Sequence, residues 1–320
     1  MNILIYGGGA VGLGLAGCLI HSREKVDIIA RKATTEALRK NGLFRTGVFG
    51  DIHAAPDQFR AFESLNELPP ENTYDYILVC TKSYDSEMVA GSLADNPLVA
   101  GPHTGIVLCQ NGWGNAETFA ACFDETRIWN ARVITGFTRP SPNHVEITVH
   151  VDAIHIGSIF GTVADDLENL CASITRGGIP CKSTSRITRD MWAKMLYNCA
   201  LNPLGAIFNV PYGKLGESGH TRLIMKRIIE EIYRVLEKTP YRTNWKTADE
   251  YLDVFFNKLI PATARHEAST LQDIKAQKRT EIDALNGAVV RLGKKHSINV
   301  STNEMIYEMI KFKEDQYLKQ

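Results

Sequence analysis

Short apolar runs alternate with helical stretches along the first half of the chain. Four of these runs have four or five residues, are rich in β-branched side chains and are almost continuous; they are Ile3–Tyr6, Val26–Ala30, Tyr76–Cys80 and Ile106–Cys109. Continuous apolar runs are typical of strands that are buried on both faces, as in a parallel sheet with helices on each side. The pattern therefore predicts an α/β fold with a doubly wound sheet.

Two longer segments, Leu43–Phe62 and Val145–Ile156, alternate between apolar and polar residues instead. A period of two is typical of strands with one buried and one solvated face. We therefore expect antiparallel edge strands in both segments.

The periodicity changes to that of helices after about residue 185. Leu223–Leu236 and Ile282–Leu292 each place apolar residues on one stripe, with charged residues off it. Beyond the alternating segments, only Pro180–Ser183 resembles a strand. We predict two domains: residues 1–185 with the sheet, and residues 186–320, which are all helical.

Composition and charge exclude several classes of protein. The 320 residues are 44% hydrophobic and carry 36 Lys and Arg against 36 Asp and Glu. A nucleic acid or an anionic membrane surface requires a basic excess, which this balance lacks. The apolar fraction is also too high for a disordered chain. We expect a folded protein with no nucleic-acid or membrane partner.

The N-terminus and the cysteines indicate a cytoplasmic location. Met1–Ile20 is apolar but lacks the positive start of a signal peptide, and glycine clusters interrupt every long apolar stretch. The seven cysteines are scattered, without a Cys-x-x-Cys pair, as in reduced cytosolic proteins. Without a pair at ligand spacing we predict no metal site.

A glycine-rich turn follows the first apolar run and leads into a helix. Its six residues are Gly7, Gly8, Gly9, Ala10, Val11 and Gly12. This is the setting of the dinucleotide-binding fingerprint of Rossmann-type domains. Gly7 permits the tight turn, Gly9 lets a pyrophosphate approach the backbone, and Gly12 lets helix and strand pack closely. We expect all six residues to bind the cofactor; a turn that is merely glycine-rich is the alternative.

Arg31 and Lys32 follow the second apolar run, where NAD-binding folds usually carry an acidic residue for the ribose hydroxyls. A carboxylate repels a 2′-phosphate, whereas a guanidinium holds it through two parallel hydrogen bonds. Asp27 lies in the middle of the run, too early to reach the ribose. We therefore predict NADP(H), held by Arg31; the alternative is that both cations are solvated loop residues.

Lys82 and Asn111 follow the next two apolar runs. The carboxyl ends of parallel strands are where open α/β sheets bind ligands. We expect both side chains near the nicotinamide half of the cofactor, although each residue type is also common in ordinary loops.

Lys194, Asn198 and Asn202 recur every four residues in a predicted helix that begins at Thr188. This spacing aligns an ammonium and two carboxamides along one face, and we expect Pro203 to break or kink the helix after them. A solvated face usually carries long charged side chains, and asparagine is a poor helix former. We interpret the ladder as the lining of a cleft.

Ser269 and Glu281 mark the starts of two further predicted helices. Ser269 begins a capping box that ends at Gln272, and Glu281 opens the helix Ile282–Leu292. Spacing alone gives both residues only capping roles. A serine at a helix N-terminus is nevertheless a natural receptor for a carboxylate, because its hydroxyl and the free amides converge there.

Taken together, these motifs resemble the ketopantoate reductase (2-dehydropantoate 2-reductase) family over nearly the whole chain. The helical pieces and their order make the match more specific than the glycine turn alone. The resemblance rests on the glycine turn, Arg31, Thr81–Lys82, Gln110–Gly112, Trp192–Pro203, Ser269–Asp273 and Thr280–Gly287.

The resemblance implies NADPH-dependent reduction of a 2-oxo acid, 2-dehydropantoate, to the 2-hydroxy acid pantoate, as in pantothenate and coenzyme A biosynthesis. It implies Lys194 as general acid and Glu281 as the residue that organises the reacting oxygen and the cofactor. It further implies that the substrate is bound by Asn198, Asn202, Ser269 and Asn111.

One position departs from the family pattern and leaves the substrate open. Tyr212 precedes Gly213 where well-known members have a further substrate-binding asparagine. The alternatives are a reductase of the same family for another 2-oxo acid, or a catalytically silent NADP-binding regulator. A sugar-nucleotide dehydrogenase would require Cys199 as nucleophile. A homodimer also stays open.

Overall fold

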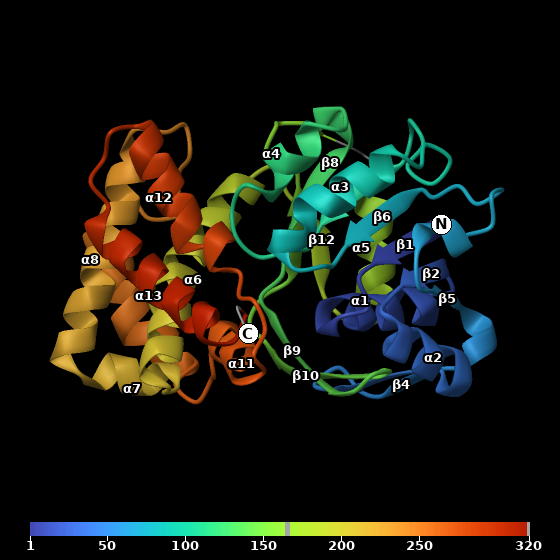
Figure 1. Ribbon diagram of the computed structural model, residues 1–320, viewed down its shortest axis with the longest axis horizontal. Helices are drawn as coiled ribbons and strands as arrows, with labels where there is room; N and C mark the ends of the chain where they lie inside the picture. The colour runs from blue at the N-terminus through green and yellow to red at the C-terminus, as the bar shows by residue number, and fades with distance from the viewer. Residues whose placement is uncertain (164–166, 319–320) are drawn as a thin grey trace. The chain divides into compact units, whose positions relative to one another are not determined.

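The computed structural model describes residues 1–163 and 167–318 and divides into two compact units (Figure 1). Unit 1 contains residues 1–110 and 115–187, and unit 2 contains residues 111–114 and 188–320. The predicted boundary after residue 185 lies two residues before this division. Nothing in the sequence indicated that residues 111–114 group with the helical unit.

Unit 1 is built on a large sheet with the strand order β12-β11-β8-β7-β6-β1-β2-β5. Its strands are β1 (Asn2–Tyr6), β2 (Lys25–Ile29), β5 (Arg60–Phe62), β6 (Tyr76–Val79), β7 (Gly105–Leu108), β8 (Ile128–Arg132), β11 (Ile154–Gly157) and β12 (Cys181–Ser183). Neighbours from β5 to β8 are parallel, and β11 is antiparallel to β8. The four apolar runs are thus confirmed as parallel strands.

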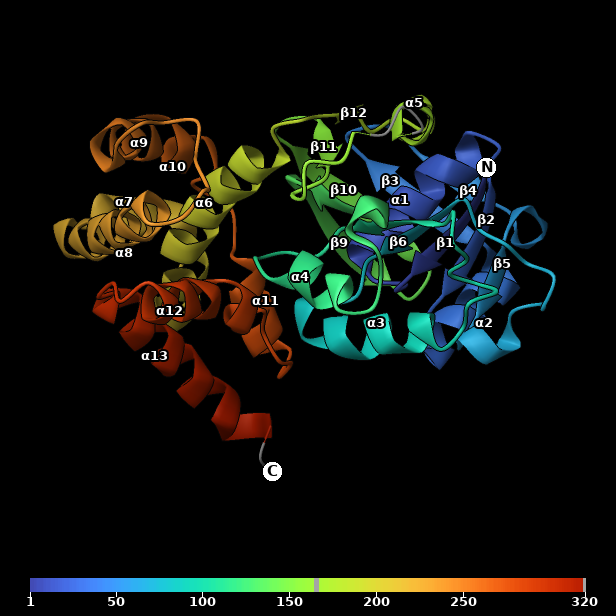
Figure 2. The same cartoon turned by 90° about the horizontal axis from the view of Figure 1, so that it is seen from above.

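Helices cover both faces of this sheet, as predicted for a doubly wound fold. Figure 2 shows α3 (Ser86–Ala94) and α5 (Leu167–Arg176) on opposite sides of it. The helix α1 (Ala10–His21) packs on the α5 side, α4 (Asn115–Ala120) on the α3 side, and α2 (Lys32–Asn41) beside β5. Within β1, Ile3 and Ile5 belong to one core and Leu4 to the other, which explains the continuous apolar run.

The alternating segments mostly form a second sheet, so their prediction as antiparallel edge strands is wrong in part. The second sheet has the order β4-β3-β10-β9, with strands β3 (Leu43–Gly47), β4 (Ile52–Ala54), β9 (Thr135–Ser141) and β10 (His144–His150). β10 is antiparallel to β9 but parallel to β3, and β5 is a parallel edge strand of the large sheet. Alternation reports the half-buried face, here Val145 and Ile147, but not the partner strand.

In the described part of unit 2, every regular element is a helix. The helices are α6 (Ile187–Phe208), α7 (Tyr212–Glu217), α8 (Gly219–Glu237), α9 (Ala248–Val254), α10 (Ile260–Ala262), α11 (Ser269–Lys275), α12 (Asn286–Lys295) and α13 (Ser301–Leu318). The predicted stripe on α8 is confirmed, and α7, α9, α12 and α13 pack around that helix. None of the described helices is both long and apolar enough to cross a membrane.

Pro203 lies inside α6 and does not end it, so a break at this residue is wrong. Proline has no N–H and leaves the carbonyl four residues earlier, that of Cys199, without its helical donor. Asn286 at the start of α12 takes that place, because its Nδ2 donates to the Cys199 carbonyl at 3.2 Å and to Asn303 Oδ1 at 3.0 Å. A neighbouring helix thus compensates for the proline.

Asn286→Ala should therefore lower the free energy of unfolding by about 1–3 kcal/mol, because it leaves a buried carbonyl without its donor. Urea denaturation measures this change. In a Pro203→Ala background the restored N–H can bond the Cys199 carbonyl, so Asn286→Ala should cost less there. Equal costs in both backgrounds would contradict this account of the proline.

Both predicted helix starts around the candidate residues need correction. The residue that caps α11 is Ala268, without a side-chain hydrogen bond, and Ser269 is the first helical residue, so the capping box is wrong. The predicted helix Ile282–Leu292 is split into a short 3₁₀ turn and α12, with Leu285 between them. The cause is Trp113, whose backbone N–H bonds the Ala284 carbonyl at 2.8 Å and removes it from the helical ladder.

Candidate active site

The glycine-rich turn joins β1 to α1 at the carboxyl end of β1. Gly7 has φ +118°, and a Cβ there would lie 2.7 Å from the Thr81 backbone nitrogen. A Cβ at Gly12 would lie 2.0 Å from the Gly7 carbonyl oxygen. At Gly9 the nearest atom would be 3.9 Å away, so the backbone is open to an approaching group. This pattern fits the fingerprint: two glycines are required by close packing, and one leaves space for a ligand.

The start of α1 offers backbone donors at the same place. The N–H of Leu13 bonds the Gly9 carbonyl, so the amides of Ala10, Val11 and Gly12 precede the helical ladder. Amides in this position, together with the helix dipole, favour an anion. The six predicted residues thus form a turn that suits a pyrophosphate.

Two guanidinium groups lie close to this turn. Arg31 is exposed at the N-cap of α2. Arg139 on β9 donates to the Gly8 carbonyl at 3.2 Å and to Thr34 Oγ1 at 2.5 Å. Burial, and next the positive charge of Arg31, lower the pKa of Arg139. The sequence analysis missed Arg139 because this residue lies more than 120 positions after the turn, where no local signal marks it.

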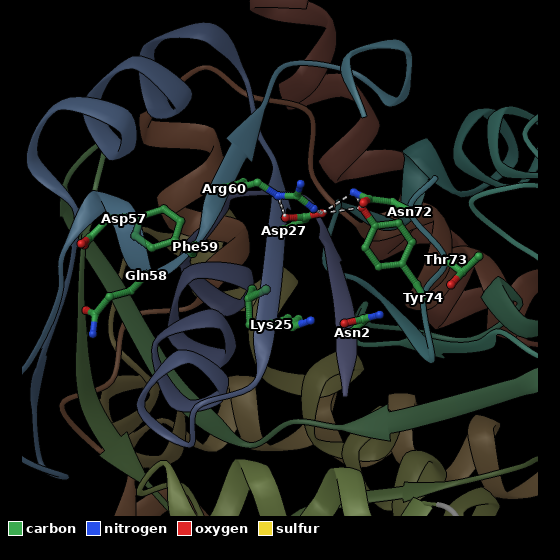
Figure 3. A pocket seen from close by; sticks show the side chains of 11 residues that line it. Asn2, Lys25, Asp27, Asp57, Gln58, Phe59, Arg60, Asn72, Thr73 and Tyr74 are labelled. Carbon is green, nitrogen blue, oxygen red and sulfur yellow. Dashed lines mark hydrogen bonds and ion pairs between the residues drawn. The ribbon is translucent and has the colours of Figure 1, made fainter. Parts of the chain in front are cut away.

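Asp27 belongs to a structural network at the opposite, amino end of the strands. Its carboxylate accepts from Arg60 Nε at 2.8 Å and Nη2 at 2.7 Å, and from the Tyr74 hydroxyl at 2.6 Å (Figure 3). The network borders a cavity of about 350 Å³ that Asn2 and Lys25, the first residues of β1 and β2, also line. Ligands of open α/β sheets bind at the carboxyl ends, so this cavity is not the cofactor site.

Lys82 follows β6 at the carboxyl end of the sheet, as predicted. Its backbone carbonyl accepts a hydrogen bond from Gln110 Nε2 at 3.2 Å, and the same nitrogen contacts Ser86 Oγ at 2.9 Å. Gln110 lies two residues after Leu108, the last residue of β7. The segments that follow β6 and β7 are thus held together through Gln110.

Lys194, Asn111 and Glu281 form a hydrogen-bonded chain in unit 2. Lys194 Nζ donates to Asn111 Oδ1 at 2.7 Å, and Asn111 Nδ2 donates to Glu281 Oε2 at 2.9 Å. The carboxamide therefore accepts from an ammonium and donates to a carboxylate, which gives it one orientation. Glu281 is 6% exposed. Three residues predicted from separate motifs thus meet, with Asn111 between the other two.

The turn at residues 111–114 is shaped to hold Asn111 in this place. Gly112 has φ +90°, and a Cβ there would lie 2.4 Å from the Ala284 carbonyl oxygen. The Trp113 ring packs 4.9 Å from that of Trp192 and 4.6 Å from that of Tyr241. The short segment is therefore anchored directly after Asn111, the residue that links Lys194 to Glu281.

Glu281 is also held from its other side. Thr280, its neighbour, donates its backbone N–H to Glu314 Oε1 at 2.7 Å and its hydroxyl to the same oxygen at 2.6 Å. Glu314 lies on α13 and is 1% exposed. A buried carboxylate near the end of the last helix thus fixes the backbone next to Glu281.

A second polar cluster lies two turns further along α6. Asn202 Nδ2 donates to Ser269 Oγ at 3.5 Å, and the Tyr212 hydroxyl donates to Asn202 Oδ1 at 2.5 Å. Asn198 and Asn202 are 9% and 4% exposed. A fully solvated face is therefore wrong for these two asparagines, and α6 carries an ammonium and two buried carboxamides on successive turns.

The buried thiol of Cys199 does not fit a nucleophile. Cys199 is 0% exposed, and burial raises its pKa well above the ordinary value. A nucleophilic cysteine requires a lowered pKa and access to its substrate. This setting argues against the sugar-nucleotide dehydrogenase alternative.

Two protein-family models match the chain. "Ketopantoate reductase PanE/ApbA" matches residues 3–160, and "Ketopantoate reductase PanE/ApbA C terminal" matches residues 186–314. The 2-dehydropantoate 2-reductase of Aquifex aeolicus (strain VF5) is 37% identical over 315 residues, which cover 98% of this chain and 97% of that protein.

Solved structures show the same architecture. A PanE/ApbA family ketopantoate reductase from Ralstonia eutropha JMP134 aligns with a TM-score of 0.85 and 26% identity over 99% of both chains. A D-mandelate dehydrogenase with NADH and anilino(oxo)acetate aligns with a TM-score of 0.86, 21% identity and 99% coverage of both chains. At that identity the second likeness concerns the fold alone.

Proposed function

This chain belongs to the ketopantoate reductase family, and we propose that it reduces 2-dehydropantoate to pantoate with NADPH, as in pantothenate and coenzyme A biosynthesis. Membership makes it an oxidoreductase that acts on a CH–OH group and depends on a dinucleotide. The observation that carries the proposal is the chain of hydrogen bonds from Lys194 through Asn111 to Glu281. It provides an ammonium that is positioned by Asn111 and linked through it to a carboxylate, and carbonyl reduction requires such a positioned proton donor.

Lys194 is the general acid of the proposed reaction. NADPH, when bound, supplies the hydride to the carbonyl carbon, and negative charge then develops on the carbonyl oxygen. The Lys194 ammonium stabilises this charge and donates the proton that completes the alcohol. Asn111 holds the ammonium in place, and Glu281 balances its charge. The proton thus moves from Nζ to the product oxygen.

The residues of unit 1 fit NADP(H). The glycine turn and the first amides of α1 suit the pyrophosphate, and Gly9 leaves the space for it. Arg31 and Arg139 provide two positive charges for the 2′-phosphate. Lys82 lies at the end of β6, on the side proposed for the nicotinamide half. Asn111 and Glu281 are further proposed cofactor ligands, as the family resemblance implies.

The buried amides of α6 and the hydroxyl of α11 are the proposed substrate ligands. Asn198, Asn202 and Ser269 offer neutral donors, which suit the carboxylate and the hydroxyl of the substrate. Since Ser269 does not cap its own helix, its hydroxyl is available to this network rather than to the backbone.

Ser269→Ala should raise the KM for the 2-oxo acid by about 10- to 100-fold, as expected for the loss of one hydrogen bond to a charged group. The affinity for NADPH should stay unchanged, because other residues hold its phosphates. Initial rates followed by NADPH absorbance give the KM, and a fluorescence titration gives the affinity. Ser301→Ala is the matched control, since Ser301 is the exposed first residue of α13. An unchanged KM in Ser269→Ala would remove this residue from the site.

A second candidate is a reductase of the same family for a different 2-oxo acid. Tyr212, at the position of a family asparagine, donates to Asn202 Oδ1, so that this amide oxygen is occupied and only the Nδ2 donors of Asn202 are offered to the substrate. A panel of 2-oxo acids with and without the 4-hydroxyl, each assayed with NADPH, separates the two candidates by kcat/KM. No turnover with any member would favour the silent regulator, against which the linked Lys194 and Glu281 argue.

A further inference from the structure

The buried tyrosine at residue 212 is held rigidly at the start of α7. Its backbone N–H bonds the His266 carbonyl at 3.2 Å, and that of Gly213 bonds the Ala264 carbonyl at 2.9 Å. The ring packs edge-on against Tyr197, with centroids 5.7 Å apart, and 5.2 Å from the His266 ring. The side chain is 2% exposed. Backbone and ring together therefore fix where the hydroxyl lies.

The hydroxyl of Tyr212 acts as a donor. Burial raises the pKa of this phenol well above its ordinary value, so it keeps its proton at neutral pH. Its single hydrogen points to Asn202 Oδ1. If the carboxamide of Asn202 turned over, this buried hydrogen would lose its acceptor, which is costly in a buried site.

From this geometry we propose that Tyr212 is a positioning residue that orients the Asn202 carboxamide, so that Asn202 presents only its N–H donors to Ser269 and the substrate. The inference rests on the proposed role of Asn202 in substrate binding. Asparagine at position 212 both donates and accepts, and would leave the orientation of Asn202 open. The substrate group at Asn202 is therefore an acceptor, a carboxylate or a hydroxyl oxygen.

Tyr212→Phe tests the proposal, with Tyr197→Phe as its matched control. Both variants keep a ring in the same aromatic cluster and lose one hydroxyl hydrogen bond; that of Tyr197 goes to Thr263 Oγ1 at 2.6 Å, outside the proposed site. Tyr212→Phe should raise the KM for the 2-oxo acid about tenfold, the range of one neutral hydrogen bond, with kcat nearly unchanged. Thermal unfolding should show similar losses for both variants. A KM that is equal in the two variants would overturn the proposal.

A double-mutant cycle separates the positioning role of Tyr212 from the proposed role of Asn202 in substrate binding, on which it rests. If Tyr212 acts only through Asn202, Tyr212→Phe should have no further effect on kcat/KM in an Asn202→Ala background. A full effect in that background contradicts the inference. If Asn202→Ala leaves the KM unchanged, the proposed role of Asn202 in substrate binding is wrong. If Asn202→Ala raises the KM but Tyr212→Phe does not, only the inference about Tyr212 is wrong.

Asn202→Asp provides a second variant that keeps the contact with Tyr212. The aspartate retains an oxygen for the tyrosine hydroxyl but replaces the donor NH₂ with a second acceptor. It should fold, bind NADPH with normal affinity in a fluorescence titration, and show a KM at least about tenfold higher. A normal KM would mean that the donors of Asn202 do not matter, and would reject the proposed orientation.

Discussion

Lys194→Ala should lower kcat by about 10²- to 10⁴-fold, the range expected when a general acid is lost. The affinity for NADPH should barely change, because its phosphates are held by other residues. The structural reason is that the Lys194 ammonium is already positioned by Asn111, 2.7 Å away, so its removal takes out the proton donor rather than a surface charge. Steady-state rates of NADPH oxidation give kcat, and a fluorescence titration gives the affinity for NADPH.

Further variants define the roles of Lys194 and Glu281 in the hydrogen-bonded chain through Asn111. Glu281→Ala should cost less than Lys194→Ala, and the two losses should not add in the double mutant, because both act through Asn111. Lys194→Arg should rescue little, since a guanidinium keeps the charge but does not release its proton. Lys214→Ala is the control, because that lysine is exposed and paired with Glu217. A near-normal kcat in Lys194→Ala would refute the proposed mechanism.

Arg31→Ala should weaken NADPH binding by about 10- to 150-fold, which corresponds to about 1.5–3 kcal/mol for one charge-assisted contact. The affinity for NADH should not change, because only NADPH carries the 2′-phosphate. Arg139→Ala should weaken NADPH binding in the same selective way. Its loss also removes hydrogen bonds to Gly8 and Thr34, so it should lower stability as well.

Fluorescence titrations of both cofactors on each variant measure these affinities. Lys40→Ala is the control, since this exposed cation lies at the other end of α2. Equal affinities for NADH and NADPH in the unmutated protein would contradict the predicted cofactor preference. The D-mandelate dehydrogenase structure with NADH has the same fold, so the fold itself does not decide between the two cofactors.

The sequence predicts strands β1, β2, β6 and β7 of the large sheet well because local pattern and burial agree there. Ile3, Leu4 and Ile5 are apolar on both sides of the strand because a core lies on each side. The alternating segments report their burial only in part: Val145 and Ile147 are buried, whereas Phe44 is exposed and Arg45 is buried. The alternating pattern does not specify which strands pair. β3 and β10 therefore pair in parallel, although antiparallel strands were predicted.

Two of the errors have a common physical cause, which is a contact from a segment distant in sequence. Pro203 stays within α6 because Asn286 bonds the carbonyl that it leaves open. The helix at Ile282 is split because Trp113 takes the carbonyl of Ala284. The chemistry-bearing residues themselves were visible in the sequence. The linking position of Asn111 and the place of Arg139 were not, because each depends on a partner more than a hundred positions away.

The anchoring of Thr280 by Glu314 has a consequence for the chain as it is synthesised. The ribosome has translated Lys194, Asn111 and Glu281 once it passes Glu281. The Glu314 carboxylate, which holds the backbone next to Glu281, comes 34 positions after Thr280. A nascent chain that ends between Glu281 and Glu314 contains all the reacting groups but lacks the carboxylate that holds the Thr280 backbone. Frameshifts and stop codons in the last helix should therefore be as damaging as substitutions at the reacting groups themselves.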